Sequence, residues 1–237
     1  MKRALIFCLI GCVVASAAWA QKDKKQKPWT EWSRKDAMKI LTDSPWARFQ
    51  TVSDSSALFS GGGASGGGTG RRARVNVDQS VPLDFYICLL SAKPVRQAWA
   101  KRIELDQNPG EEFKAQLLKF VETPSDEWIT ISVTFNSPDE QIEAMVKQEF
   151  NRAGTERLRE DTYLELKNGK RAVLQEYGSP ERDLMGARFR FARTVDGQPF
   201  ITRESGDIHF HARVTQTIVL NARFKASDLL YDGALEF

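Results

Sequence analysis

The sequence predicts an α+β fold, in which helices from the N-terminal and middle parts pack on a mostly antiparallel sheet with a C-terminal β-meander. Apolar residues recur at helical spacing as far as about residue 150, and they alternate with polar residues after about residue 160. Two turn dipeptides, Asn168-Gly169 and Asp196-Gly197, interrupt the alternating part. The 237 residues are 41% hydrophobic and 27% charged, which is a globular composition and excludes a fully disordered chain or a membrane protein with several spans.

The first twenty residues have the pattern of a signal peptide. Lys2 and Arg3 supply the positive start, and an uncharged apolar stretch follows. Ala18 and Ala20 place small residues at the two positions that a signal peptidase reads. We therefore expect residues 1–20 to be cleaved off, giving an exported protein that is periplasmic or extracellular and has no transmembrane span.

Two alternatives to this cleavage remain. The uncharged run Ala4–Ala20 has 17 residues, close to the minimum of about 17 for a membrane-spanning helix, so it could act as an uncleaved anchor. The segment Leu9–Cys12 resembles a bacterial lipobox, which would make the protein lipid-anchored through Cys12.

Cleavage would change both the cysteine count and the charge. It removes Cys8 and Cys12 and leaves Cys88 alone, so no intramolecular disulfide could form. It also removes two of the 34 basic residues and none of the 31 acidic ones, which lowers the net charge from +3 to +1. Because this balance offers no basic excess, we expect no nucleic-acid partner.

The mature chain is expected to form one domain over residues 29–237. Residues 21–28 form a polar, lysine-rich tail with almost nothing to bury, and this tail is predicted to be disordered. Residues 60–74 are rich in glycine and then in arginine, and they predict a flexible insertion within the domain.

The first helix is expected to follow a capping box of Ser33 and Asp36, with Ala37, Leu41 and their neighbours as its apolar face. Ser44-Pro45 predicts the start of another helix. The later elements expected from apolar spacing are a buried central strand over 83–90, helices over 95–103 and 113–121, a half-buried strand over 128–135, a helix opened by a capping box at 137–140, strands over 163–167, 171–177, 186–193, 198–203, 207–214 and 217–224, and a short edge strand over 234–237.

Two glycine-rich matches to catalytic motifs lack the structural setting that the chemistry needs. Gly61–Gly66 fits a dinucleotide-binding pattern, but more glycines follow where a helix should start. Gly63–Gly67 fits a nucleophile elbow around Ser65, but a flexible tract cannot hold a strained turn. Cys88 lies in the most apolar strand, where a thiol is expected to be inert. We therefore predict no catalytic residues and no cofactor, and we lean against an enzyme.

A candidate metal site is formed by His209 and His211, the only histidines in the sequence. Strand alternation places both side chains on the same polar face, together with Arg213. An H-x-H pair can supply two ligands to zinc or to another divalent metal, but a third ligand is needed. The acidic candidates for that third ligand are Glu176, Glu204 and Asp207. The competing interpretation is an ordinary solvent-facing polar row.

A candidate anion site combines Arg188 and Arg190 with Arg213. If their strands were neighbours, these arginines and the two histidines would form a basic face for a carboxylate, a phosphate or an acidic partner. The alternative is that they are solvated arginines balanced by nearby glutamates.

Two stretches resemble a family of exported bacterial proteins of unknown function. One is the tryptophan-bounded box Trp32–Ala47, and the other runs from Ala222–Lys225 to Tyr231–Gly233. The resemblance implies export and brings no activity. The clustered Trp29, Trp32 and Trp46 suggest either a platform for a carbohydrate or peptide, or an anchor for the first helix.

Taken together, the sequence favours an exported, non-enzymatic module that binds an unknown protein or an envelope component. The alternative function is metal or anion binding, possibly hydrolytic, at the His209/His211/Arg213 face.

Overall fold

The computed structural model describes residues 27–52, 81–180 and 185–237. The predicted signal peptide, most of the tail and the glycine-rich insertion lie outside these residues. An eight-stranded antiparallel sheet dominates the fold, in the order β1-β2-β3-β6-β5-β4-β9-β10. Its strands are β1 (Ala47–Val52), β2 (Leu83–Leu89), β3 (Trp128–Asn136), β4 (Thr162–Leu166), β5 (Arg171–Gly178), β6 (Ala187–Ala192), β9 (Asp207–Arg213) and β10 (Val219–Lys225).

The sheet curls until its two edge strands, β1 and β10, lie side by side. Side chains rather than a backbone ladder join them: the Gln50 amide donates to the Val219 carbonyl at 2.8 Å and accepts from the Asn221 N–H at 2.8 Å. Arg48 Nε donates to the Arg223 carbonyl at 2.5 Å. These bonds satisfy backbone groups of β10 that would otherwise form an open sheet edge, so they close the sheet into a barrel.

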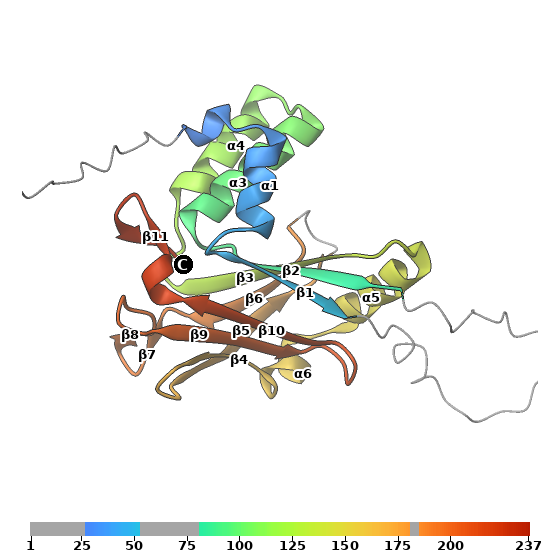
Figure 1. Cartoon of the computed structure of the whole chain (residues 1–237), viewed down its shortest axis with the longest axis vertical. Coiled ribbons are helices and arrows are strands. Elements are labelled where there is room, and N and C mark those ends of the chain that lie inside the picture. The colour runs from blue at the N-terminus through green and yellow to red at the C-terminus, as the bar shows by residue number, and fades with distance from the viewer. Residues whose placement is uncertain (1–26, 53–80, 181–184) are drawn as a thin grey trace, which may run out of the picture.

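Aromatic rings fill the interior of the barrel. Phe210 of β9 makes edge-to-face contacts with Phe189 and Phe191 of β6, although two strands separate β9 from β6 in the sheet order. Helix α5 (Glu140–Arg152) inserts Phe150 against Phe85, with ring centroids 6.2 Å apart. Together with α6 (Thr155–Arg159), α5 lies at one end of the barrel (Figure 1). The interior is therefore a packed core.

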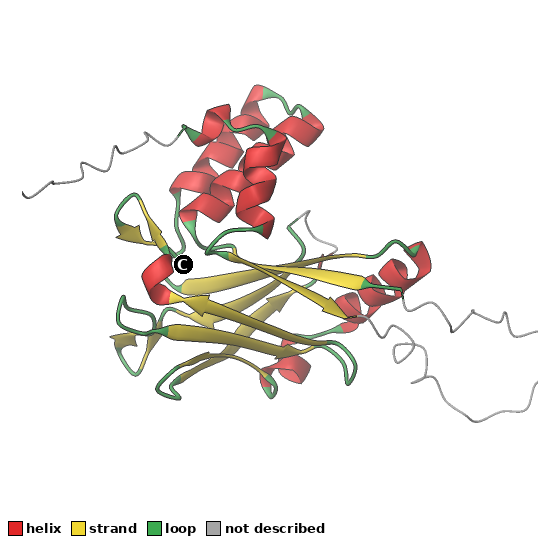
Figure 2. Ribbon diagram, viewed as in Figure 1, coloured by secondary structure: helices red, strands yellow, loops and turns green. Residues whose placement is uncertain are grey.

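A layer of helices covers the outer face of β2 and β3 (Figure 2). It contains the short helix η1 (Trp29–Glu31), α1 (Arg34–Thr42), α3 (Lys93–Gln107) and α4 (Glu111–Glu122). The predicted capping box starts α1, because Asp36 N–H donates to Ser33 Oγ and Ser33 N–H donates to the Asp36 carboxylate at 2.8 Å. Arg96 of α3 is buried and donates to the Ser91 and Val121 carbonyls, which ties α3 to the end of α4.

The last two residues of the sequence join the helical layer to the barrel. The side-chain carboxylate of Glu236 accepts a hydrogen bond from the backbone N–H of Lys93, at the start of α3, at 2.8 Å. The backbone carbonyl of Glu236 accepts a hydrogen bond from the indole N–H of Trp46, also at 2.8 Å. Arg193 donates to the Phe237 carbonyl and lies over the Phe237 ring. A small hairpin of β11 (Leu230–Tyr231) and β12 (Ala234–Leu235) precedes this contact.

The α+β prediction is confirmed, and most elements lie where the apolar spacing predicts them. Ser44-Pro45 does not start a helix: Ser44 Oγ donates to the Ile40 carbonyl, and the chain turns there into β1. The expected strand over 198–203 is reduced to β8 (Gln198–Pro199), which pairs only with β7 (Thr194–Val195) around the Asp196-Gly197 turn.

Four further details differ from the expectation. The strand over 128–135 is not half-buried, because Thr130 and Ser132 on its outer face are also buried. The helix cap at 137–140 is made by Asp139, whose carboxylate accepts the N–H groups of Gln141 and Ile142. The strand over 234–237 pairs with β11 and not with the main sheet. The meander holds within β4-β5-β6, but β9 returns to pair with β4.

Replacing Gln50 with alanine tests the closure of the barrel. We expect Gln50→Ala to lower the free energy of unfolding by about 1–3 kcal/mol, because it removes two hydrogen bonds to β10, each worth about 0.5–1.5 kcal/mol. Urea denaturation followed by circular dichroism measures the change.

Gln175→Ala is the matched control, because Gln175 is exposed on β5 and its amide donates to the Val173 carbonyl of the same strand. We expect that substitution to change stability by less than about 0.5 kcal/mol. Equal effects of the two substitutions would show that Gln50 does not hold the seam.

Candidate functional site

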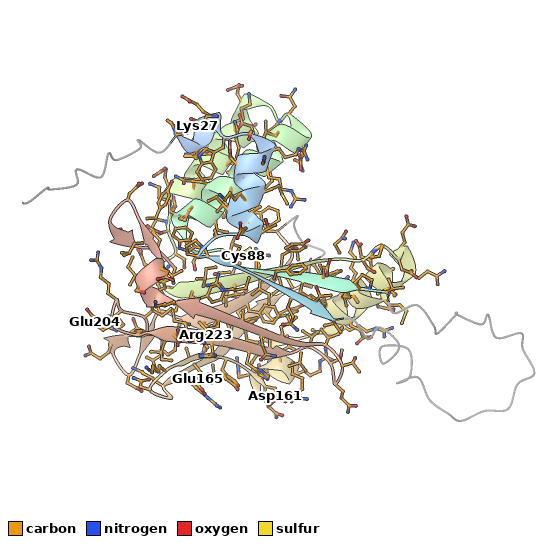
Figure 3. The ribbon with its side chains drawn as sticks, in the orientation of Figure 1. Lys27, Cys88, Asp161, Glu165, Glu204 and Arg223 are labelled. Carbon is orange, nitrogen blue, oxygen red and sulfur yellow. The ribbon has the colours of Figure 1, made fainter. Side chains whose placement is uncertain are left out.

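His209 and His211 project from the outer face of β9, as strand alternation predicts. They border a shallow depression of about 330 Å³ on β4, β9 and β10. The sheet register places Glu165 and Arg223 on either side of His209, and Tyr163 and Asn221 on either side of His211. Figure 3 shows Glu165 and Arg223 together on this side of the barrel.

Neighbouring side chains already occupy much of this face. His211 Nδ1 lies 2.9 Å from the Asn221 side-chain oxygen, and its ring stacks on Tyr163 with the centroids 5.2 Å apart. Arg171 lies over the Tyr163 ring, with its guanidinium carbon 4.1 Å from the centroid, and it pairs with Glu165. The rings therefore do not form a free stacking platform.

The acidic residues considered as a third metal ligand do not gather around the two histidines. Asp207 pairs with Arg223 at 2.5 Å, and this hydrogen bond holds the pKa of Asp207 below its usual value. Glu176 lies on β5 and pairs with Arg190. Figure 3 places Glu204 at the opposite end of the barrel from Asp161. Within the described residues, no three His, Cys, Asp or Glu side chains form a group that could hold a metal ion.

The predicted anion site is not assembled, because its strands are not neighbours. Arg188 and Arg190 lie on β6, and Arg213 lies on β9, with β5 and β4 between them. Arg190 pairs with Glu176 at 2.6 Å, and Arg213 pairs with Asp161 at 3.1 Å. Acidic partners thus balance both arginines where they stand.

Cys88 belongs to β2 and lies under the helical layer (Figure 3). Its thiol donates to the Leu41 carbonyl, with sulfur and oxygen 3.2 Å apart. Burial raises the pKa of this thiol to about 12. Because the thiolate is the nucleophilic form, this environment keeps Cys88 unreactive at neutral pH.

A second surface lies between α1 and the β11–β12 hairpin, and it includes Trp32 and Trp46 of the tryptophan cluster noted in the sequence. This aromatic groove encloses about 300 Å³. Its lining residues are Lys27, Trp32, Asp36, Lys39, Ile40, Trp46, Leu230 and Tyr231. The groove thus brings Trp32 and Trp46, from the stretch Trp32–Ala47, next to Tyr231, near the end of the stretch that begins at Ala222.

The polar atoms of the three rings are bonded inside the protein. Trp32 donates its indole N–H to the Lys27 carbonyl at 2.9 Å, and Trp46 donates its own to Glu236 at 2.8 Å. Tyr231 donates its hydroxyl to the Gln97 side chain at 2.8 Å, and burial raises the pKa of Tyr231. The three rings therefore offer hydrocarbon and ring surface to the groove rather than free hydrogen-bond donors.

Local sequence chemistry explains how the groove is built. Asp36, Lys39 and Ile40 are spaced so that they share one face of α1, and Trp32 lies just before this helix. Trp46 meets Tyr231 edge to face, with the centroids 6.0 Å apart. Asp232 and Gly233 both have positive φ, so this dipeptide turns the hairpin and brings Leu230 and Tyr231 to the groove. The tryptophan cluster in the sequence was a signal for this site, but the contribution of the distant hairpin was not visible.

Comparison of the chain with protein-family models, with curated proteins and with solved structures gave no match. In the part of the chain that the structure describes, no helix has both the length and the apolar character needed to cross a bilayer.

We expect Cys88 to resist alkylation in the folded protein. Its raised pKa leaves almost no thiolate even at mildly alkaline pH, and burial blocks the reagent. Treatment with N-ethylmaleimide followed by peptide mass mapping should show an unmodified Cys88 peptide in the native protein and a fully modified one in urea. Rapid native modification would contradict the inert assignment.

Proposed function

We propose that the protein is an exported, non-enzymatic binding module and that the aromatic groove holds an apolar part of an envelope component. One observation carries this proposal. Three rings with internally bonded polar atoms line a groove of about 300 Å³, and Leu230 at its edge is 43% exposed. Exposed apolar surface that is concave and rigidly held is typical of a binding site.

The chemistry of the candidate nucleophile and bases supports binding rather than catalysis. The Cys88 thiol is buried with a raised pKa. The His211 ring is engaged by Asn221, and Glu165 is engaged by Arg171. Export is supported by the signal-peptide pattern of residues 1–20.

A neutral apolar dye tests the groove directly. We expect N-phenyl-1-naphthylamine to bind saturably, with one dye per protein and increased fluorescence. Leu230→Ser removes exposed apolar surface from the groove, and it should weaken binding several-fold because each buried methylene contributes about 0.8 kcal/mol.

Val173→Ser is the matched control, since Val173 is 47% exposed on β5 and does not line the groove. It should leave dye binding unchanged. If the dye does not bind, or if both substitutions act equally, the groove is not the site.

Zinc binding at the outer face of β9 is the second candidate function. The observation that favours it is that His209 and His211 share one face beside a depression, with Glu165 opposite His209 in the register. Within the described residues, the His209 ring makes no hydrogen bond, so it is available to a metal. Arg171 would have to release Glu165 for a third ligand to form.

Thermal unfolding with and without zinc tests this candidate. Zinc at 100 times its dissociation constant should stabilise the protein by about 2.7 kcal/mol, and the double substitution His209→Ala with His211→Ala should abolish that gain. Glu165→Gln should reduce it if this carboxylate is the third ligand. An unchanged midpoint in zinc would reject the candidate.

A further inference from the structure

The charges around the aromatic groove are unbalanced in favour of cations. Lys27 and Lys39 are exposed side chains at its edge, and Asp36 is the one acidic residue among its lining residues. The Asp36 carboxylate is occupied by the backbone N–H and hydroxyl of Ser33, at 2.8 and 2.7 Å. These bonds lower the pKa of Asp36, and the charge of Lys27 lowers it further. With two lysines and one aspartate, the lining residues keep one net positive charge at the exposed edge of the groove.

The groove runs beside α1. Asp36 and Ile40 are four residues apart on this helix, which corresponds to ~6 Å along its axis, and Trp32 lies just before the helix begins. Figure 3 shows Lys27 at the end of the helical layer that lies away from the sheet, and the hydrogen bond from Trp32 fixes the backbone of Lys27 there. Trp46 and Tyr231 form the other end, close to the barrel. The site thus has a cationic edge and an apolar interior.

The absence of free donors on its rings decides which ligand the groove fits. A peptide or a sugar buried there would lose its hydrogen bonds to water and would regain none from Trp32, Trp46 or Tyr231, which costs about 1–3 kcal/mol for each polar group. A hydrocarbon chain loses no hydrogen bonds and gains from burial.

We infer that the groove binds an anionic amphiphile, with an acyl chain against Trp32, Ile40, Trp46, Leu230 and Tyr231 and its acidic head group beside Lys27 and Lys39. This inference rests on the proposed binding function and specifies its ligand. The occupant is a single soluble amphiphile, because the site is a groove of about 300 Å³ rather than an extended flat surface.

Decanoate and decanol, which share one chain length and differ in charge, test the inference. Titration calorimetry of the full chain, below the concentrations at which decanoate forms micelles, should show decanoate binding about 3- to 10-fold more tightly, as expected for one or two exposed ion pairs. Lys39→Gln should reduce the ratio of decanoate affinity to decanol affinity, because Lys27 is then the one lysine left at the head group. Leu230→Ser should weaken both ligands.

Lys119→Gln, on α4 and outside the groove, should preserve the preference for decanoate. Decyltrimethylammonium should bind more weakly than decanol. Equal affinities for decanoate and decanol, or tighter binding of the cation, would overturn the anionic assignment and leave the binding function standing. Failure of all three ligands and of N-phenyl-1-naphthylamine would overturn the binding function itself.

Discussion

Glu236 makes the contact on which the arrangement of the whole molecule depends. Its carboxylate caps the start of α3, and its carbonyl accepts the Trp46 indole just before β1. The adjacent Phe237 is held by Arg193 beside β6. The helical layer, the first strand and the barrel are thus joined by two residues, and the same contact orients Trp46 toward Tyr231. The aromatic groove exists because these elements are fixed relative to one another.

The barrel contributes a constraint of a different kind. Its interior is filled by Phe189, Phe191, Phe210 and other apolar side chains, so a ligand has no place inside it. Binding surface must come from outside, either from the polar face of β4, β9 and β10 or from an added element. The hairpin β11–β12 and helix α1 are such additions, and they enclose a groove without disturbing the core.

Local rules predicted what local sequence determines. The Ser33–Asp36 capping box, the Asn168-Gly169 turn and the shared face of His209 and His211 are all present. The pairing of strands that are distant in the sequence could not be predicted from local patterns. β9 pairs with β4, and the resulting strand order separates Arg188 from Arg213. The Ser44-Pro45 prediction was wrong because the same residues suit both a helix start and a turn. The groove depends on a contact between Trp46 and Tyr231, which are far apart in the sequence. The spacing of apolar residues does not predict such a contact.

The seam between β1 and β10 also has a consequence for how the chain folds. Gln50 and Val219 are 169 positions apart, so their hydrogen bond must wait for almost every other strand to find its place. Until then, both edge strands present unpaired backbone groups to their surroundings. Strand exchange with a second copy is easiest during that interval, and aggregation is therefore a hazard of slow or interrupted folding rather than of the finished molecule.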